Sequence, residues 1–127
     1  MNEFKLLPKI FNWQKAQEKI PYKVYTALLT QTGTNAPVAT VLENTIGNIW
    51  FSYVNAGIYA INSNGLFTEN KTIVFLGSVG DSDLSAGYTS RVFITDNTNI
   101  GISSLVGTGS SFDSVMFNTP IEIRVYN

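Results

Sequence analysis

Two closely spaced acids, Asp81 and Asp83, are the residues of this chain whose types and spacing come nearest to a recognisable chemistry. They stand in the segment GDSD, inside a stretch rich in glycine and serine. Two carboxylates two residues apart on an irregular loop can share a calcium ion with help from carbonyl oxygens. The segment lacks the third ligand and the closing glutamate of a twelve-residue calcium loop. We interpret it as a solvated turn, with calcium binding as the alternative.

The other acids of the body offer no catalytic motif. They are scattered along the chain, at Glu43, Glu69, Asp96, Asp113 and Glu122. The sequence has no cysteine and no histidine, which excludes a disulfide scaffold, a zinc site of the usual ligands and a histidine-based triad. A carboxylate pair formed only by folding, as in glycoside hydrolysis, stays open. We predict a protein that is not an enzyme and uses no cofactor.

Four aromatic residues, three of them on expected strands, suggest a second kind of chemistry. Trp50, Tyr53, Tyr59 and Tyr88 could form a platform that stacks on a sugar, because aromatic side chains combine apolar area with a polar tip. Alternating aromatic residues on strands more often belong to a core. We name Tyr88 as the possible glycan contact, since its expected position in a loop predicts that it is the most exposed of the four.

The elements that must position these residues are all expected to be strands. Apolar runs with a period of two recur at a spacing of roughly ten residues, with Gly, Asn, Asp and Pro between them. The first long run, YKVYTALLTQ, is apolar on both faces, as in a strand covered on both sides. The expected strands are 22–31, 38–43, 49–54, 58–62, 71–76, 91–95, 100–106, 112–117 and 121–126.

This pattern predicts an all-β domain over residues 22–127, a β-sandwich with jelly-roll topology favoured. In the closing strand IEIRVY, Ile121, Ile123 and Val125 are expected to point inward. Phe67 is expected to fill the core from a loop. No internal repeat and no further domain boundary is visible in the body.

Residues 1–21 are expected to form an N-terminal docking arm. Pro8 and Pro21 limit any helix, and a short one over Trp13–Lys19 would be marginal alone. Residues 1–23 carry a charge of +3 and residues 24–127 a charge of −4. The arm either packs on its own domain or reaches a neighbouring subunit. Its large apolar side chains are Phe4, Leu6, Leu7, Ile10, Phe11 and Trp13.

The composition points to a surface that acts by contact. Charged residues make up 13% of the chain, and Asn, Ser and Thr together number 37. Uncharged polar faces cost less to desolvate when subunits associate. Residues 24–127 contain only three basic residues, which argues against a nucleic-acid groove. We see no signal peptide and no stretch long enough to cross a bilayer, and therefore expect no membrane insertion and synthesis in a cytoplasm without secretion.

Three segments together resemble a known group of proteins. YKVYTALLTQTGTNAPVATVLENTIGNIWFSYVNAGIYAI, ENKTIVFLGS and PIEIRVYN are similar to a small domain of virion and tail-appendage structural proteins of bacteriophages infecting Bacteroidota. The resemblance covers most of residues 22–127 and leaves out the arm. It implies an all-β, oligomeric particle component and transfers no catalytic or ligand residue.

We therefore expect a virion protein that decorates a capsid or forms part of a spike or fibre. Its expected partners are itself, as a homotrimer, and other virion proteins. The alternative is a receptor-binding module that recognises host surface polysaccharide. A hydrolase acting on such polysaccharide is the third hypothesis.

Overall fold

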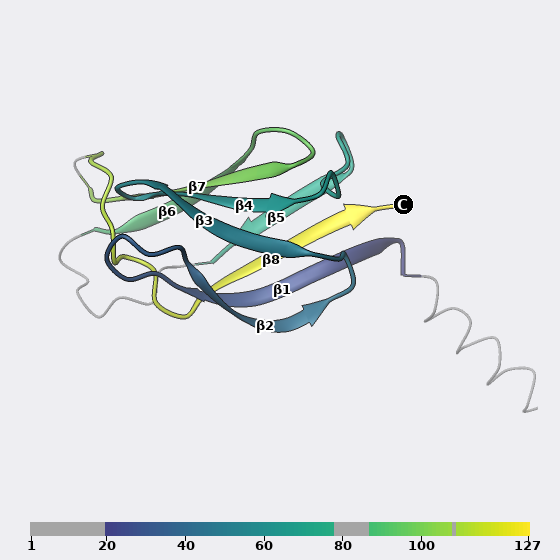
Figure 1. The fold of residues 1–127 in the computed structure, drawn as a ribbon, viewed down its shortest axis with the longest axis horizontal. Helices are drawn as coiled ribbons and strands as arrows, with labels where there is room; N and C mark the ends of the chain where they lie inside the picture. Colours follow the sequence, from purple (N-terminus) through teal and green to yellow (C-terminus); the bar gives the residue numbers. More distant parts are fainter. Residues whose placement is uncertain (1–19, 78–86, 108) are drawn as a thin grey trace, which may run out of the picture.

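The computed structural model describes residues 20–77, 87–107 and 109–127, which form two four-stranded antiparallel sheets packed face to face (Figure 1). The predicted β-sandwich is confirmed. The eight strands are β1 (Tyr22–Thr30), β2 (Val38–Asn44), β3 (Ile49–Asn55), β4 (Ile58–Ser63), β5 (Thr72–Leu76), β6 (Thr89–Ile94), β7 (Asn99–Leu105) and β8 (Thr119–Tyr126).

One sheet has the order β2-β1-β8-β5 and the other β3-β4-β7-β6. Three hairpins, β1–β2, β3–β4 and β6–β7, therefore stay within a single sheet, and the remaining connections cross between sheets. This order does not confirm the jelly-roll topology that the sequence favours. The edge strands on one side of the sandwich are β2 and β3, and those on the other side are β5 and β6.

The core lies between the four central strands. Buried and less buried residues alternate along β4 and β8, whereas β7 is buried without interruption from Ile100 to Ser104. The expected inward residues of β8 are confirmed, since Ile121, Ile123 and Val125 are all buried. Phe67 fills the core from the loop after β4, with 1% of its surface exposed. Tyr25 of β1 and Tyr59 of β4 are the largest buried side chains of the two sheets.

The ninth expected strand, over residues 112–117, is wrong. The chain there forms a loop, and its nearest strand-like feature is a single bridge between Leu105 and Ser111. Ser114 has a φ of 62°, which a continuous strand does not accommodate. Val115 and Met116 are nevertheless buried, so their hydrophobicity serves the core from a loop.

Several predictions fall outside the described residues. The docking-arm residues Phe4, Leu6, Leu7, Ile10, Phe11 and Trp13 all precede Ile20. The candidate calcium residues Asp81 and Asp83 lie in the second undescribed range, 78–86. These predictions stand as they were made from the sequence.

Candidate functional site

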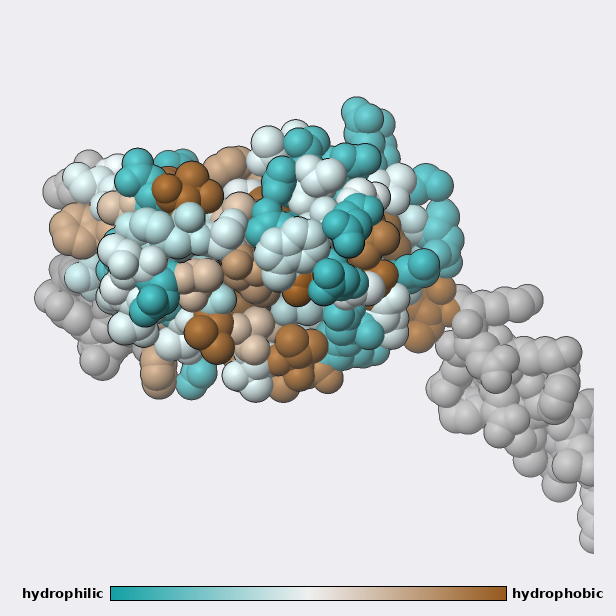
Figure 2. Space-filling view, viewed as in Figure 1, coloured by the Kyte–Doolittle hydropathy of each residue, from teal (hydrophilic) through white to brown (hydrophobic). Residues whose placement is uncertain are grey.

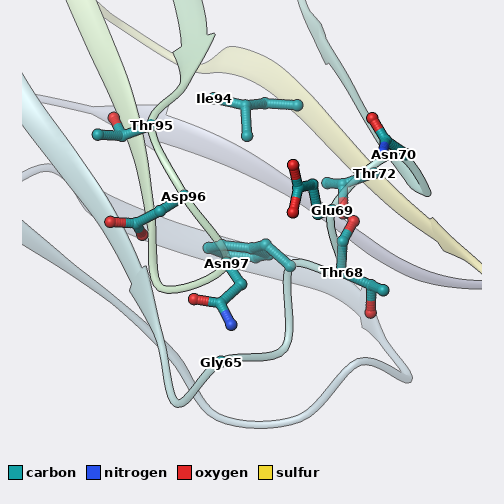
Figure 3. Close-up of a pocket in the computed structure, with 10 residues that line it drawn as sticks. Gly65, Thr68, Glu69, Asn70, Thr72, Ile94, Thr95, Asp96 and Asn97 are labelled. Carbon is teal, nitrogen blue, oxygen red and sulfur yellow. Dashed lines mark hydrogen bonds between the residues drawn. The ribbon is translucent and has the colours of Figure 1, made fainter.

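An open hollow of about 730 Å³ lies at one end of the sandwich, between the β4–β5 connection and the β6–β7 turn. Figure 3 shows Glu69 in the middle of this hollow, below Ile94, while the carboxylate of Asp96 points away from Glu69. The lining is Gly65, Phe67, Thr68, Glu69, Asn70, Thr72, Ile94, Thr95, Asp96 and Asn97.

The acids of the hollow do not form a catalytic pair. Asp96 folds back on its own turn, where its Oδ1 accepts hydrogen bonds from Thr98 N at 2.8 Å and Asn99 N at 2.9 Å. A third bond from the Thr98 hydroxyl, together with these two, holds the pKa of Asp96 below its ordinary value. Glu69 then remains as a single exposed carboxylate, which cannot supply both halves of an acid–base mechanism.

Asp113 is held by residues that are distant in the sequence. Its carboxylate accepts hydrogen bonds from Gly57 N at 2.7 Å, from the Tyr53 hydroxyl at 2.8 Å and from the Tyr59 hydroxyl at 2.9 Å. Burial disfavours the charged form, but these donors outweigh it and hold the pKa of Asp113 below its ordinary value. The arrangement ties the β7–β8 loop to the β3–β4 hairpin. We assign it a structural role.

Glu122 and Arg124 form an ion pair on the outer face of the β2-β1-β8-β5 sheet, with 2.8 Å between Oε2 and the guanidinium. The guanidinium carbon also lies 4.7 Å from the ring centre of Tyr22 and 5.2 Å from that of Phe75. Such stacking is an ordinary cation–π contact. Within the described ranges, no three potential metal-ligand side chains gather in one place.

The four aromatic residues do not form one platform, and Tyr59 belongs to the core, as alternating aromatic residues on strands usually do. Tyr53 and Tyr59 point toward the sandwich interior and Asp113, while Trp50 lies on the opposite face of β3. Tyr88 is half-buried just before β6, whereas 42% of Trp50 is exposed. The prediction that Tyr88 would be the most exposed of the four is therefore wrong, because its loop position did not leave it open to solvent.

Exposed apolar side chains instead gather on the four edge strands. Of the twelve large hydrophobic residues that are exposed in the described part of the chain, nine lie on these strands and none on the four central ones. We call two groups of them the β2/β3 edge and the β5/β6 edge. The β2/β3 edge consists of Val38, Val41, Leu42, Trp50 and Val54, and the β5/β6 edge consists of Ile73, Phe75, Phe93 and Ile94. Figure 2 shows hydrophobic side chains over β2, along the lower margin of the face in view.

A β-bulge contributes to the exposure on β2. Thr26 pairs with Glu43 and Ala27 pairs with Val41, so Leu42 is the extra residue between them. In a regular strand, neighbouring side chains point to opposite faces. Here both Val41 and Leu42 are open to solvent, at 50% and 61%.

The edge strands carry few of the charged and proline residues that protect the edges of a monomeric sheet protein, although β2 and β3 each contain a bulge. Natural edge strands carry lysine, proline or inward-pointing charges that discourage pairing with another chain. The four edge strands contain no lysine and no proline, and their charged residues are Glu43 on β2 and Arg91 on β6. The edges are therefore the surface best suited to contact with another protein.

Comparison with known proteins adds no relative: no family model matches the chain, and neither does any curated protein or solved structure. Within residues 20–77, 87–107 and 109–127, no helix has the length and hydrophobicity to cross a membrane.

Proposed function

We propose that this chain is a structural subunit of a bacteriophage particle that works by protein–protein contact. The observation that carries this proposal is the concentration of nine exposed large apolar residues on four edge strands that contain only two charged residues. Exposed apolar side chains gathered on edge strands favour contact with another protein. The subunit would be oligomeric and would decorate a capsid or form part of a tail appendage.

Two further features support a building role. The body carries few charges, and polar but uncharged surfaces are cheap to bury in an assembly. Of its nine charged residues within the described ranges, Glu122 and Arg124 pair with each other, and Asp96 and Asp113 accept hydrogen bonds from neighbouring groups. The resemblance of most of residues 22–127 to phage structural domains is the reason for proposing that the assembly is a phage particle.

The test is to look for the protein in purified particles of the phage that encodes it. Quantitative mass spectrometry should find the chain in a fixed copy number per particle. A variant lacking residues 1–21 should keep a folded body but drop out of particles, because we assign docking to the arm. A chain that is made during infection yet never co-purifies with particles would overturn the proposal.

A second candidate function is recognition of a host surface polysaccharide. Trp50 favours it, since its exposed ring lies beside polar groups on the outer face of the β3-β4-β7-β6 sheet. The Asn62 amide donates to Trp50 O at 3.3 Å and to the Ser52 hydroxyl at 3.1 Å, which places an amide and a hydroxyl next to the ring. An aromatic face flanked by such groups suits a sugar ring.

Glycan-array binding separates the two functions. A receptor-binding module should bind one class of polysaccharide, and Trp50→Ala should abolish that binding. Phe117→Ala is a matched control, because Phe117 is also exposed, at 55%, but lies in the β7–β8 loop. A pure building block should show no sugar-dependent binding.

A further inference from the structure

We infer that copies of this chain join head to tail, with the β2/β3 edge of one copy against the β5/β6 edge of the next, and that the contact closes into a ring. This inference rests on the proposed structural function and gives it a geometry. The occupant of each apolar edge is thus a second copy of the same chain. Three observations lead to this arrangement.

The first observation is that both edges of the sandwich are apolar. The β2/β3 edge exposes Leu42 and Val54, each at 61%, and the β5/β6 edge exposes Phe75 at 50% and Ile94 at 49%. The two edges lie on opposite sides of the sandwich, because each sheet is four strands wide. A two-fold dimer would cover one edge with its own copy and leave the other exposed, whereas a head-to-tail ring covers both.

The second observation is the charge on the edges. The β2/β3 edge strands carry one charged residue, the exposed acid Glu43, and the β5/β6 edge strands carry one, the exposed base Arg91. An edge that meets its own copy would bring two like charges together. Head-to-tail contact brings opposite charges to the same interface, which favours encounter in that orientation.

The third observation is the size of one edge. A strand of seven residues such as β2 is about 23 Å long, and packed sheets are about 10 Å apart, so the edge has a footprint of about 230 Å² before outward-facing side chains are added. A stable interface takes about 800 Å² from each partner. One such contact is small. A closed ring holds every copy at two such contacts, whereas an open filament leaves each terminal copy with one.

The decisive experiment uses two full-length variants, each with one damaged edge. Leu42→Glu places a charge on the β2/β3 edge, and Ile73→Glu places one on the β5/β6 edge. We expect the unchanged protein to show a mass of at least three chains by light scattering, and each variant alone to show one chain of 14.0 kDa. A mixture of the two variants should give a species of two chains, since each variant retains the edge that the other needs.

Other outcomes overturn the inference. If one variant keeps its oligomer, the copies associate through a single self-complementary edge. If both keep it, residues outside the edges hold the assembly. A monomeric or dimeric unchanged protein, or a mixture that stays monomeric, also contradicts a ring.

Two controls keep the result interpretable. Phe117→Glu changes an exposed apolar residue of the β7–β8 loop, which belongs to neither pair of edge strands, and should leave the mass unchanged. If a first variant fails to fold, as judged by circular dichroism, Val54→Glu and Ile94→Glu damage the same two edges at other positions.

A charge reversal tests the orientation separately. Glu43→Arg and Arg91→Glu should each lower the oligomer fraction at low salt, and the double variant should restore it.

Failure of the ring is also distinguishable from failure of the proposed function. An edge variant that is monomeric in solution but still joins particles in normal copy number would contradict the ring and leave the structural role intact. A protein that forms rings but is absent from particles would contradict the structural role and leave the ring intact.

Discussion

The buried hydroxyl of Tyr59 donates a 2.9 Å hydrogen bond to the carboxylate of Asp113, which lies 54 residues further along the chain. Tyr59 belongs to β4 and is 1% exposed, while Asp113 belongs to the long loop between β7 and β8. Burial and this hydrogen bond raise the pKa of Tyr59. The pair fastens that loop onto the end of the sandwich, and the loop in turn contributes the buried residues Val115 and Met116 to the interior.

Tyr59→Phe should lower the free energy of unfolding by about 2 kcal/mol, because a hydrogen bond to a charged group is lost while the ring still fills the core. Urea denaturation measures this change. Thr26 donates to Glu122 at 3.2 Å, so Thr26→Val provides a comparison at a site with a longer bond and should cost less. Equal costs for the two variants would argue against a special role for the Asp113 contacts.

The Asp113 contacts should also make stability depend on acidic pH. The folded protein lowers the pKa of Asp113, so the unfolded chain takes up the proton first as the pH falls. The contribution is complete above the unfolded pKa of about 3.9 and disappears as the pH falls through the lower folded pKa. The difference in unfolding free energy between the unchanged protein and Asp113→Asn should therefore shrink on going from pH 7 to strongly acidic pH. A difference that stays constant over this range would contradict the assignment.

Gly57 is the backbone partner of the same carboxylate, and its substitution should be costly. Gly57 has a φ of 69°, and an added Cβ would lie 2.5 Å from Phe112 N and 2.8 Å from Ser104 O. Since both neighbours are backbone atoms, Gly57→Ala should lower stability by about 3 kcal/mol or more. Gly33→Ala is the matched control: Gly33 has a φ of 57° but open space around it, and the change should cost about 1 kcal/mol. Thermal denaturation of the two variants checks the order.

Much of the fold could be predicted because a strand is visible in the local alternation of apolar and polar residues. The alternation in IEIRVY indicated which face of β8 is buried, and the structure confirms it with Ile123 fully buried. The pairing of strands could not be predicted, because β1 pairs with β8, which lies near the other end of the sequence. The segment 112–117 was mistaken for a strand because its apolar residues are those of the core. Its path is set instead by distant groups, including Gln31, whose Oε1 accepts a 2.6 Å hydrogen bond from Ser114 N.

The candidate site was harder to read for the same reason. An apolar residue on an edge strand looks like one on a central strand until the sheet order is known. Leu42 and Phe75 therefore gave no sign in the sequence that they would be exposed. The absence of lysine and proline from these strands was visible, but it becomes informative only when the strands are known to be edges.

Thr119 provides a test in which a substitution should stabilise the protein. It is fully buried at the start of β8, and its hydroxyl has no hydrogen-bond partner among the described residues. An unpaired buried hydroxyl costs free energy, and valine has nearly the same shape without it, so Thr119→Val should raise the free energy of unfolding by about 1 kcal/mol. Thr119→Ala removes the hydroxyl as well but leaves a void beside Leu29, its partner across the β1–β8 pair, and should lower stability. Urea denaturation of both variants decides the question, since a destabilising Thr119→Val would mean that the hydroxyl is satisfied in solution.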